Sequence, residues 1–406
     1  MHGSRPRWPA VVLCPAPSTM SASALTPSFP SRLPNVGTTI FTVMSALATE
    51  HKAVNLGQGF PDFGCDPALI DSVSRAMQAG HNQYPPMTGV PALREVVAQK
   101  IEALYGKRYD ANSEITVTAG ATQAILTVIL SCVSPGDEVI VLDPCYDSYV
   151  PSIELAGGVP VRVPLTPKTF RPDFGKIAAA ITPKTRLLLI NTPHNPSGTT
   201  WTAQEMQQLQ DLLAPTNILL LADEVYEHMV FDGERHESAS RYPGLAARAY
   251  VVSSFGKTFH VTGWKVATVA APAPLTAEFR KVHQFNVFTV NTPMQVGLAE
   301  YLKDPAPYLN LPAFYQKKRD LFRAGLEGSR LKLLPSSGTY FQCVDISAVT
   351  DASEAEFCQQ LVKDLGVAAI PLSAFYGDGF DQQVVRFCYA KKDETLLAAL
   401  ERLRKL

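Results

Sequence analysis

The sequence predicts an α/β fold, in which a large domain built on a mostly parallel sheet is followed by a smaller α+β domain. Three observations lead to this prediction. Short apolar runs alternate with amphipathic helical patterns through the middle of the 406-residue chain. Several of these runs are continuously apolar, as in strands that are buried on both faces of a parallel sheet. Towards the C-terminus, a long helix precedes strands and helices in mixed order.

Residues 1–32 are expected to form a disordered tail, because they are rich in proline, serine and threonine. The apolar run Val11-Val12-Leu13 is too short, and too close to prolines, to serve as the core of a signal peptide. Met20 is a second candidate for the first residue of the natural protein.

The elements of the large domain are expected between residues 61 and 290. Two helices each have proline in their first turn and glycine after their end, at residues 66–79 and 91–105. Buried strands are expected at 115–118, 138–142, 186–190, 218–221, 250–252 and 266–270, with helices at 122–133 and 202–213. Residues 291–406 are expected to form the small domain, with helices at 313–326, 354–365 and 394–403 and strands at 338–345 and 384–388. We expect residues 33–60 to pack against it.

The composition excludes several classes of function. The net charge is −1, so no basic surface argues for a nucleic-acid partner. No apolar stretch approaches the roughly 18 residues that a membrane helix needs. The cysteines form no CxxC pair and have no zinc-ligand spacing, which favours a reducing cytoplasm and predicts no metal site. They stand at positions 14, 65, 132, 145, 343, 358 and 388.

Polar, turn-prone residues follow four of the predicted strands at their carboxyl ends. They are Ala119–Thr122, Asn191–Gly198, Ala222–Tyr226 and Ser253–Lys257. Open α/β sheets bind their ligands at this edge, so the sequence predicts a site there.

One part of this site suits a phosphate. Gly120, Ala121 and Thr122 lie between a strand and a helix, where backbone N–H groups and a hydroxyl can bind an anion. Ser254 and Lys265 could add a second hydroxyl and a positive charge.

The other side chains suit an aromatic aldehyde. Asp223 follows an apolar strand and could pair with a protonated ring nitrogen, although helix capping is an alternative. Tyr146 offers an aromatic face, and Asn195 and Tyr226 offer hydrogen bonds to a ring oxygen. Lys257 offers an amine. Phosphate, pyridinium, phenolic oxygen and aldehyde together describe pyridoxal 5'-phosphate.

Four separated motifs resemble, in order, those of the class I and II aminotransferases of pyridoxal-phosphate fold type I. They are Asn195-Pro196-Ser197-Gly198, Asp223-Glu224-Val225-Tyr226, Ser253–Phe259 with Thr262–Lys265, and Val385–Cys388. The resemblance runs from about Leu33 to the C-terminus. Each motif alone is weak evidence, whereas four in the right order are highly specific.

Shorter segments are similar to particular branches of that family. Residues 55–63 resemble the kynurenine aminotransferases, and residues 37–41 and 84–89 resemble bacterial methionine aminotransferases.

The resemblance implies roles for individual residues. Lys257, Asp223 and Tyr226 would be catalytic, with Lys257 holding the cofactor and moving the substrate proton. Arg386 would receive the substrate carboxylate with Asn195 and the backbone of Gly59. Ile40 and Phe41 would line the side-chain pocket. The family's active sites form across a homodimer, in which Tyr84 would reach the phosphate of the neighbouring subunit.

The same resemblance indicates the substrates, an amino acid and a 2-oxo acid that react in ping-pong order. No arginine lies between Lys281 and Glu300, where relatives that prefer acidic amino acids have one. Phe285, Phe288 and Met294 are present instead. These apolar side chains favour methionine or an aromatic amino acid, kynurenine included, as the donor. The alternative is that a cation such as Lys281 enters the pocket.

Two other functions are compatible with some of these residues. A cysteine-S-conjugate β-lyase would use the same Lys257 and Asp223, so no motif separates it from an aminotransferase. A non-catalytic regulator that binds pyridoxal phosphate would need an added DNA-binding domain, and residues 1–30 are too short and too rich in proline for one.

Overall fold

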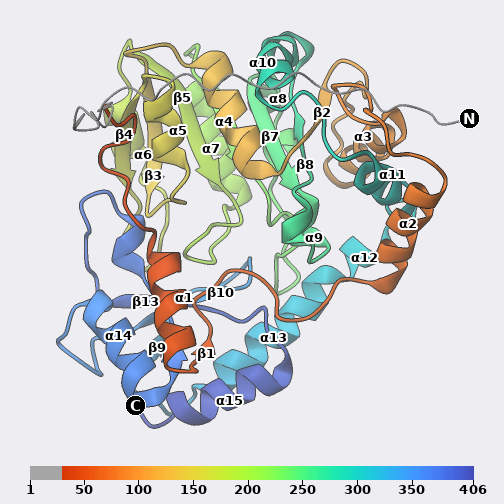
Figure 1. The fold of residues 1–406 in the computed structure, drawn as a ribbon. Coiled ribbons are helices and arrows are strands. Elements are labelled where there is room, and N and C mark those ends of the chain that lie inside the picture. Colours follow the sequence, from red (N-terminus) through yellow and green to blue (C-terminus); the bar gives the residue numbers. More distant parts are fainter. Residues whose placement is uncertain (1–29) are drawn as a thin grey trace, which may run out of the picture. The chain divides into compact units, whose positions relative to one another are not determined.

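The computed structural model describes residues 30–406 (Figure 1). The predicted disordered tail, except its last three positions, therefore lies outside the described residues, as do Met20 and Cys14. Met1–Pro34 and Asn35–Leu406 are two separate units, and the second contains all the helices and strands described below. Within residues 30–406, none of the helices combines the length and apolar character needed to cross a membrane.

The strands are β1 (Val54–Asn55), β2 (Ile115–Thr118), β3 (Glu138–Asp143), β4 (Val159–Pro164), β5 (Thr185–Asn191), β6 (Leu219–Asp223), β7 (Ala249–Ser254), β8 (Ala267–Ala270), β9 (Lys332–Leu333), β10 (Phe341–Asp345), β11 (Val367–Ala368), β12 (Ile370–Pro371) and β13 (Val384–Cys388). The helices are α1 (Ile40–Glu50), α2 (Pro67–Gln78), α3 (Pro91–Tyr105), α4 (Ala121–Cys132), α5 (Tyr149–Leu155), α6 (Phe174–Ala180), α7 (Ala203–Leu213), α8 (Pro243–Ala246), α9 (Phe255–Thr258), α10 (Ala273–Asn286), α11 (Thr292–Tyr301), α12 (Ala306–Leu309), α13 (Leu311–Gly325), α14 (Glu354–Leu365) and α15 (Asp393–Leu403).

The central sheet has seven strands in the order β2-β8-β7-β6-β5-β3-β4. Strands β7, β6, β5, β3 and β4 are parallel to one another, which confirms the predicted α/β fold with a mostly parallel sheet. Strand β8 is antiparallel to both β7 and β2, so β2 points in the same direction as β7. As a result, β2, β3, β5, β6 and β7 all end at the same edge of the sheet.

The middle of this sheet is apolar because its strands are covered on both faces. The side chains of Leu188, Ile190, Leu220 and Leu221 in β5 and β6 are fully buried. Burial of each such side chain contributes about 1.5–3 kcal/mol to folding. Helix α4 packs on β6, β7 and β8 and also contacts α5 and α10.

Strand β4 is an element that the sequence analysis does not predict. It lies at the edge of the sheet and pairs only with β3. Its sequence, Val-Pro-Val-Arg-Val-Pro, contains two prolines, which argue against a central strand but are tolerated at an edge.

A second sheet lies near the C-terminus, with the antiparallel order β12-β13-β10-β9. Strand β10 begins three residues later than predicted because Gly338 pairs with Val230 in an isolated bridge and residues 339–340 form a turn, in which Thr339 has a positive φ of 65°. Strand β1 pairs with β11, and α1 contacts α14 and β11 (Figure 1). The domain boundary at residue 291 stays a proposal, and α11, which begins just after it, packs against α2 and α3.

Candidate active site

A cavity opens at the edge of the central sheet where β2, β3, β5, β6 and β7 end. Segments that are far apart in the sequence contribute to its walls, because each follows the carboxyl end of a different strand. Its lining brings together all the residues predicted to bind the cofactor within one subunit, namely Gly120, Ala121, Thr122, Tyr146, Asn195, Asp223, Tyr226, Ser254, Lys257 and Lys265.

Asp223 is the last residue of β6 and is buried in the floor of this cavity. Its carboxylate accepts a hydrogen bond of 2.5 Å from the Tyr149 hydroxyl and one of 3.3 Å from the backbone N–H of Val225. Burial raises the pKa of Asp223 to about 6, although these hydrogen bonds and the charge of Lys257 act in the opposite direction. Among residues 30–406, no cation forms a hydrogen bond or an ion pair with this carboxylate, so a cationic ligand in the cavity would stabilise its charged form.

Lys257 lies in α9, the single helical turn that follows β7. Burial lowers the pKa of its amine to about 8, in spite of the negative charge of Asp223. The amine donates a hydrogen bond of 3.2 Å to the Tyr340 hydroxyl. An amine with such a pKa carries both protonation states near neutral pH, which suits both nucleophilic attack and proton transfer.

The N-terminus of α4 forms an anion-binding corner of the cavity. Gly120 is its N-cap residue, and within residues 30–406 no side chain caps this helix end, so amide N–H groups of its first turn are available. A Cβ atom at Gly120 would lie 3.0 Å from the amine nitrogen of Lys265. Glycine at this position therefore lets Lys265 approach the helix end, where its charge adds to the positive end of the helix dipole.

Arg386, in the middle of β13, is almost completely buried. Its guanidinium donates hydrogen bonds to the Asn195 side-chain oxygen at 2.7 Å and to the Gly57 carbonyl at 3.0 Å. Its Nε atom is buried without a hydrogen-bond partner among residues 30–406, and no carboxylate in that part of the chain forms an ion pair with it. A buried guanidinium with an unused donor is suited to bind an anionic ligand.

Aromatic rings surround this guanidinium. Its central carbon lies 4.0 Å from the ring centre of Phe341, 5.0 Å from that of Phe375 and 5.4 Å from that of Phe41. Phe41 also packs edge-on against Phe375 at 5.8 Å. The predicted pocket residue Ile40 is half-buried at the start of α1. The space next to Arg386 is therefore walled mainly by apolar rings.

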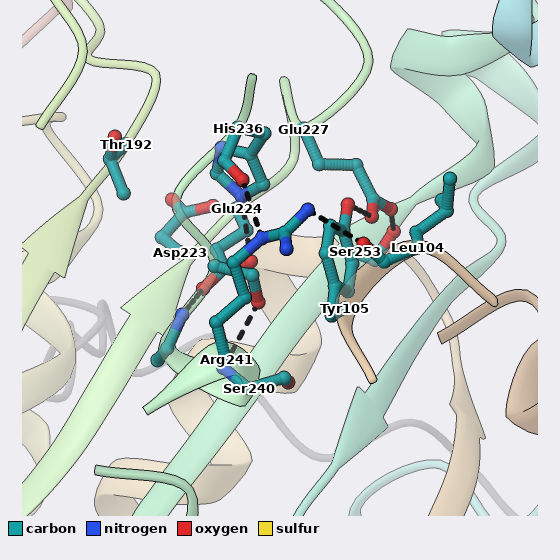
Figure 2. Close-up of polar contacts among 12 residues, drawn as sticks. Leu104, Tyr105, Thr192, Asp223, Glu224, Glu227, His236, Ser240, Arg241 and Ser253 are labelled. Atoms are coloured by element: carbon teal, nitrogen blue, oxygen red, sulfur yellow. Dashed lines mark hydrogen bonds and ion pairs between the residues drawn. The ribbon is translucent and has the colours of Figure 1, made fainter. Parts of the chain in front are cut away.

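A buried polar network lies next to the ends of β6 and β7 (Figure 2). The Glu227 carboxylate accepts hydrogen bonds from the hydroxyls of Tyr105 and Ser253, and Glu224 lies 2.8 Å from the His236 ring. The residue just before Glu224 and the residue just after Ser253 both line the cavity. The network thus ties together two strand ends whose side chains face the site.

Tyr84, Phe285 and Phe288, which the sequence associates with the site, do not line this cavity. The side chain of Tyr84 is 81% exposed and packs edge-on against Phe288, with ring centres 5.4 Å apart. Phe285 is 87% exposed and Phe288 is 44% exposed. The proximity of these phenylalanines to the substrate side chain therefore stays a prediction.

Three further residues contact the predicted site, and their roles were not predicted from the sequence. Tyr149 binds Asp223, the Asn191 amide donates to the backbone carbonyl of Asp223 at 2.8 Å, and Tyr340 binds Lys257. Asn191 could have been found, since it opens the motif that contains Asn195. The two tyrosines carry no such signal because neither belongs to one of the motifs that identify the site.

Comparison with known proteins identifies the family of this chain. Residues 51–403 match the family model described as aminotransferase class I and II. Methionine aminotransferase from Escherichia coli K12 is 53% identical over 93% of this chain and 98% of its own length. Kynurenine–oxoglutarate transaminase 3 from Rattus norvegicus is 35% identical over 95% of this chain and 92% of its own length. A crystal structure identified with an E. coli methionine aminotransferase superposes with a TM-score of 0.92, over 94% of this chain and 100% of that one. The chain belongs to the class I and II aminotransferase family.

Proposed function

We propose that this aminotransferase uses pyridoxal 5'-phosphate to move the amino group of methionine, or of an aromatic amino acid such as kynurenine, to a 2-oxo acid. Members of the family depend on this cofactor. The observation that carries the proposal is the arrangement of Asp223, Lys257, the α4 N-terminus and Arg386 around the end of one sheet.

The residues present fit pyridoxal phosphate. The buried Asp223 carboxylate forms no ion pair among residues 30–406, and a protonated ring nitrogen would supply a cationic partner. The uncapped N-terminus of α4 with Lys265 would hold the phosphate, together with Ser254. Tyr146 would face the ring, and Tyr226 and Asn195 would bind its oxygen, since all three line the same cavity.

The bound cofactor would supply an aldehyde that exchanges amino groups and a ring that accepts the electrons of the substrate's Cα–H bond. The protein's own groups do the rest. Arg386 and Asn195 would bind the substrate carboxylate and thereby orient that bond. Asp223 would keep a proton on the ring nitrogen. Lys257 would remove the proton from Cα and deliver it to the carbon that was the cofactor's aldehyde, because its lowered pKa lets it act as both base and acid.

The proposed donors follow from the surroundings of Arg386. Phe41, Phe341 and Phe375 offer an apolar surface to a thioether or an aromatic ring. A second carboxylate would lose its hydration there without gaining a cation from these rings. The names of the E. coli and rat relatives, which refer to methionine and kynurenine, support the same choice.

Reduction of the purified protein with borohydride is expected to attach the cofactor to a peptide that contains Lys257. The reason is that this lysine is the amine of the cavity that lies beside Asp223, whereas Lys265 lies at the anion-binding corner. Peptide mass spectrometry locates the label, and a Lys257→Ala protein serves as the control that should take none. Label on Lys265 instead would contradict the assignment of Lys257.

Methionine, followed by phenylalanine, tyrosine and kynurenine, is expected to exceed aspartate as a donor by about tenfold or more in kcat/KM, since burial of each extra apolar methylene is worth about 0.8 kcal/mol. The comparison follows 2-oxo acid production with one fixed acceptor. A preference for aspartate would overturn the apolar-pocket argument and require a cation from elsewhere. Release of pyruvate and ammonia from cysteine conjugates without any acceptor would instead support the β-lyase alternative.

We also propose a cytoplasmic homodimer in which Tyr84 acts in the neighbouring subunit's site. Its high exposure, beside the exposed Phe288, supports this arrangement. Mixing inactive Tyr84→Ala and Lys257→Ala proteins should then restore activity, because each mixed dimer holds one intact site. Random exchange would give at most about a quarter of the parent activity. No recovery, with subunit exchange demonstrated by a mass tag, would contradict donation by the neighbouring subunit.

A further inference from the structure

Tyr340 lies in the turn before β10 and is completely buried. Its hydroxyl contacts two groups of the proposed active site. It donates a hydrogen bond of 2.6 Å to the backbone carbonyl of Gly59 and accepts one of 3.2 Å from the Lys257 amine. Nothing in the mechanism above uses this tyrosine.

The direction of these two hydrogen bonds is fixed by chemistry. A carbonyl oxygen can only accept, so the single hydroxyl proton of Tyr340 is committed to Gly59. Burial raises the pKa of Tyr340 well above its ordinary value, so the hydroxyl keeps that proton. The oxygen of Tyr340 is therefore left to accept from Lys257, and it also faces the hydroxyl of Tyr226.

Packing holds the hydroxyl in place. The ring of Tyr340 meets Tyr226 edge-on at 5.2 Å and Phe341 edge-on at 4.9 Å, and a tilted Tyr315 ring lies 5.7 Å away. Its backbone carbonyl accepts a hydrogen bond of 3.0 Å from the backbone N–H of Tyr389, the residue that follows β13. A side chain that is fixed on all sides can hold a flexible lysine with little further loss of entropy.

The segment that contains Gly59 also contacts Arg386, the residue proposed to bind the substrate carboxylate. The Gly57 carbonyl accepts from Arg386, and two residues later the Gly59 carbonyl accepts from Tyr340. A continuous path of contacts therefore joins the group that would bind the substrate carboxylate to the amine that would move the substrate proton.

We propose that Tyr340 is a positioning residue for Lys257, whose free amine it holds as a hydrogen-bond acceptor at the place where that amine takes up the substrate proton. This inference rests on the proposed function, in which Lys257 carries the cofactor and then acts as base and acid.

The first test uses the cofactor-free protein and acetic anhydride as the probe. The rate at which Lys257 is acetylated as a function of pH gives the pKa of its amine. An oxygen that accepts from the amine stabilises the ammonium form, so Tyr340→Phe should lower this midpoint by about one pH unit. Tyr315→Phe is the matched control, because Tyr315 is equally buried in the same ring cluster but its hydroxyl has no partner among residues 30–406. Its midpoint should equal that of the parent.

The second test uses the holoenzyme and a single turnover with methionine. Tyr340→Phe should slow this half-reaction by about tenfold, with the Kd for methionine changed by less than about threefold, since the loss is in proton transfer rather than binding. Equal midpoints and equal rates in the Tyr340 and Tyr315 variants would overturn the proposal. If the parent protein carries no cofactor on Lys257, the proposed function is contradicted. The acetylation midpoints would still decide whether Tyr340 holds the Lys257 amine.

Discussion

Replacing Asp223 with alanine or asparagine is expected to slow transamination by about 10²–10⁴-fold, the range found when a group that stabilises charge is removed from an active site. Asp223 is a buried carboxylate that forms no ion pair within the described part of the chain, and its proposed partner is the ring nitrogen of the cofactor. Asparagine keeps the shape and can still bind the Tyr149 hydroxyl, but it has no charge to hold a proton on that nitrogen. The rate of the half-reaction with methionine measures the loss.

The control for this experiment is Asp345→Asn. Asp345 is an equally buried carboxylate at the end of β10, but it pairs with Lys168 and does not line the cavity. Its replacement should leave the catalytic rate within about threefold of the parent, since charges remote from the reaction contribute little to it. Near-normal turnover of the Asp223 variants would show that the ring nitrogen has another partner or needs none.

A folding defect can be separated from a catalytic one by the pH dependence of stability. The folded-state pKa of Asp223 is raised, to about 6, so its stabilising contribution is present at low pH and is lost as the pH rises through about 6. At pH 7.5 the cofactor-free Asp223→Asn protein should therefore have a Tm at least as high as the parent. A lower Tm would mean that the carboxylate stabilises the fold.

The cavity can be predicted from the sequence because short stretches are enough to recognise both the strands and the polar residues that follow them. Continuous apolar runs identify strands such as β5 and β6, and each is followed directly by its functional residues. Once the strands are parallel, Asn195 and Asp223 must meet at one edge of the sheet. Neither inference requires knowledge of contacts between distant segments.

Tyr149 and Tyr340 could not be predicted in the same way. Neither belongs to a recognised motif, and its role depends on which group its hydroxyl meets after folding. Tyr340 lies 83 residues after Lys257 and 281 residues after its other partner, Gly59. Contacts of this kind are set by tertiary packing, for which local patterns carry no signal.

The pocket for the substrate side chain is a different case. The prediction places Phe285 and Phe288 there by resemblance, yet both are exposed and lie away from the cavity. Residues contributed by a second subunit would be exposed in a single chain, as Tyr84 is. A pattern in one sequence identifies such residues without indicating which subunit's site they enter.

Replacing Arg386 with alanine is expected to lower kcat/KM for methionine by about 10²–10³-fold, because two charge-assisted hydrogen bonds to the substrate carboxylate would be lost at about 1.5–3 kcal/mol each. Cofactor affinity should change by less than about threefold, since Arg386 binds Asn195 and Gly57 rather than the phosphate corner. Steady-state kinetics and titration of the cofactor-free protein measure the two quantities separately.

Arg386→Lys tests whether charge or geometry matters at this position. Lysine keeps the charge but cannot form the two parallel hydrogen bonds of a guanidinium, so it should recover only part of the loss. The rings of Phe341 and Phe375, which now flank the flat guanidinium at 4.0 and 5.0 Å, fit a planar cation better than an ammonium. The cofactor titration contains no substrate, so the loss of a substrate contact cannot change its result. If cofactor affinity falls as much as kcat/KM in both variants, Arg386 stabilises the fold around the site instead of binding substrate.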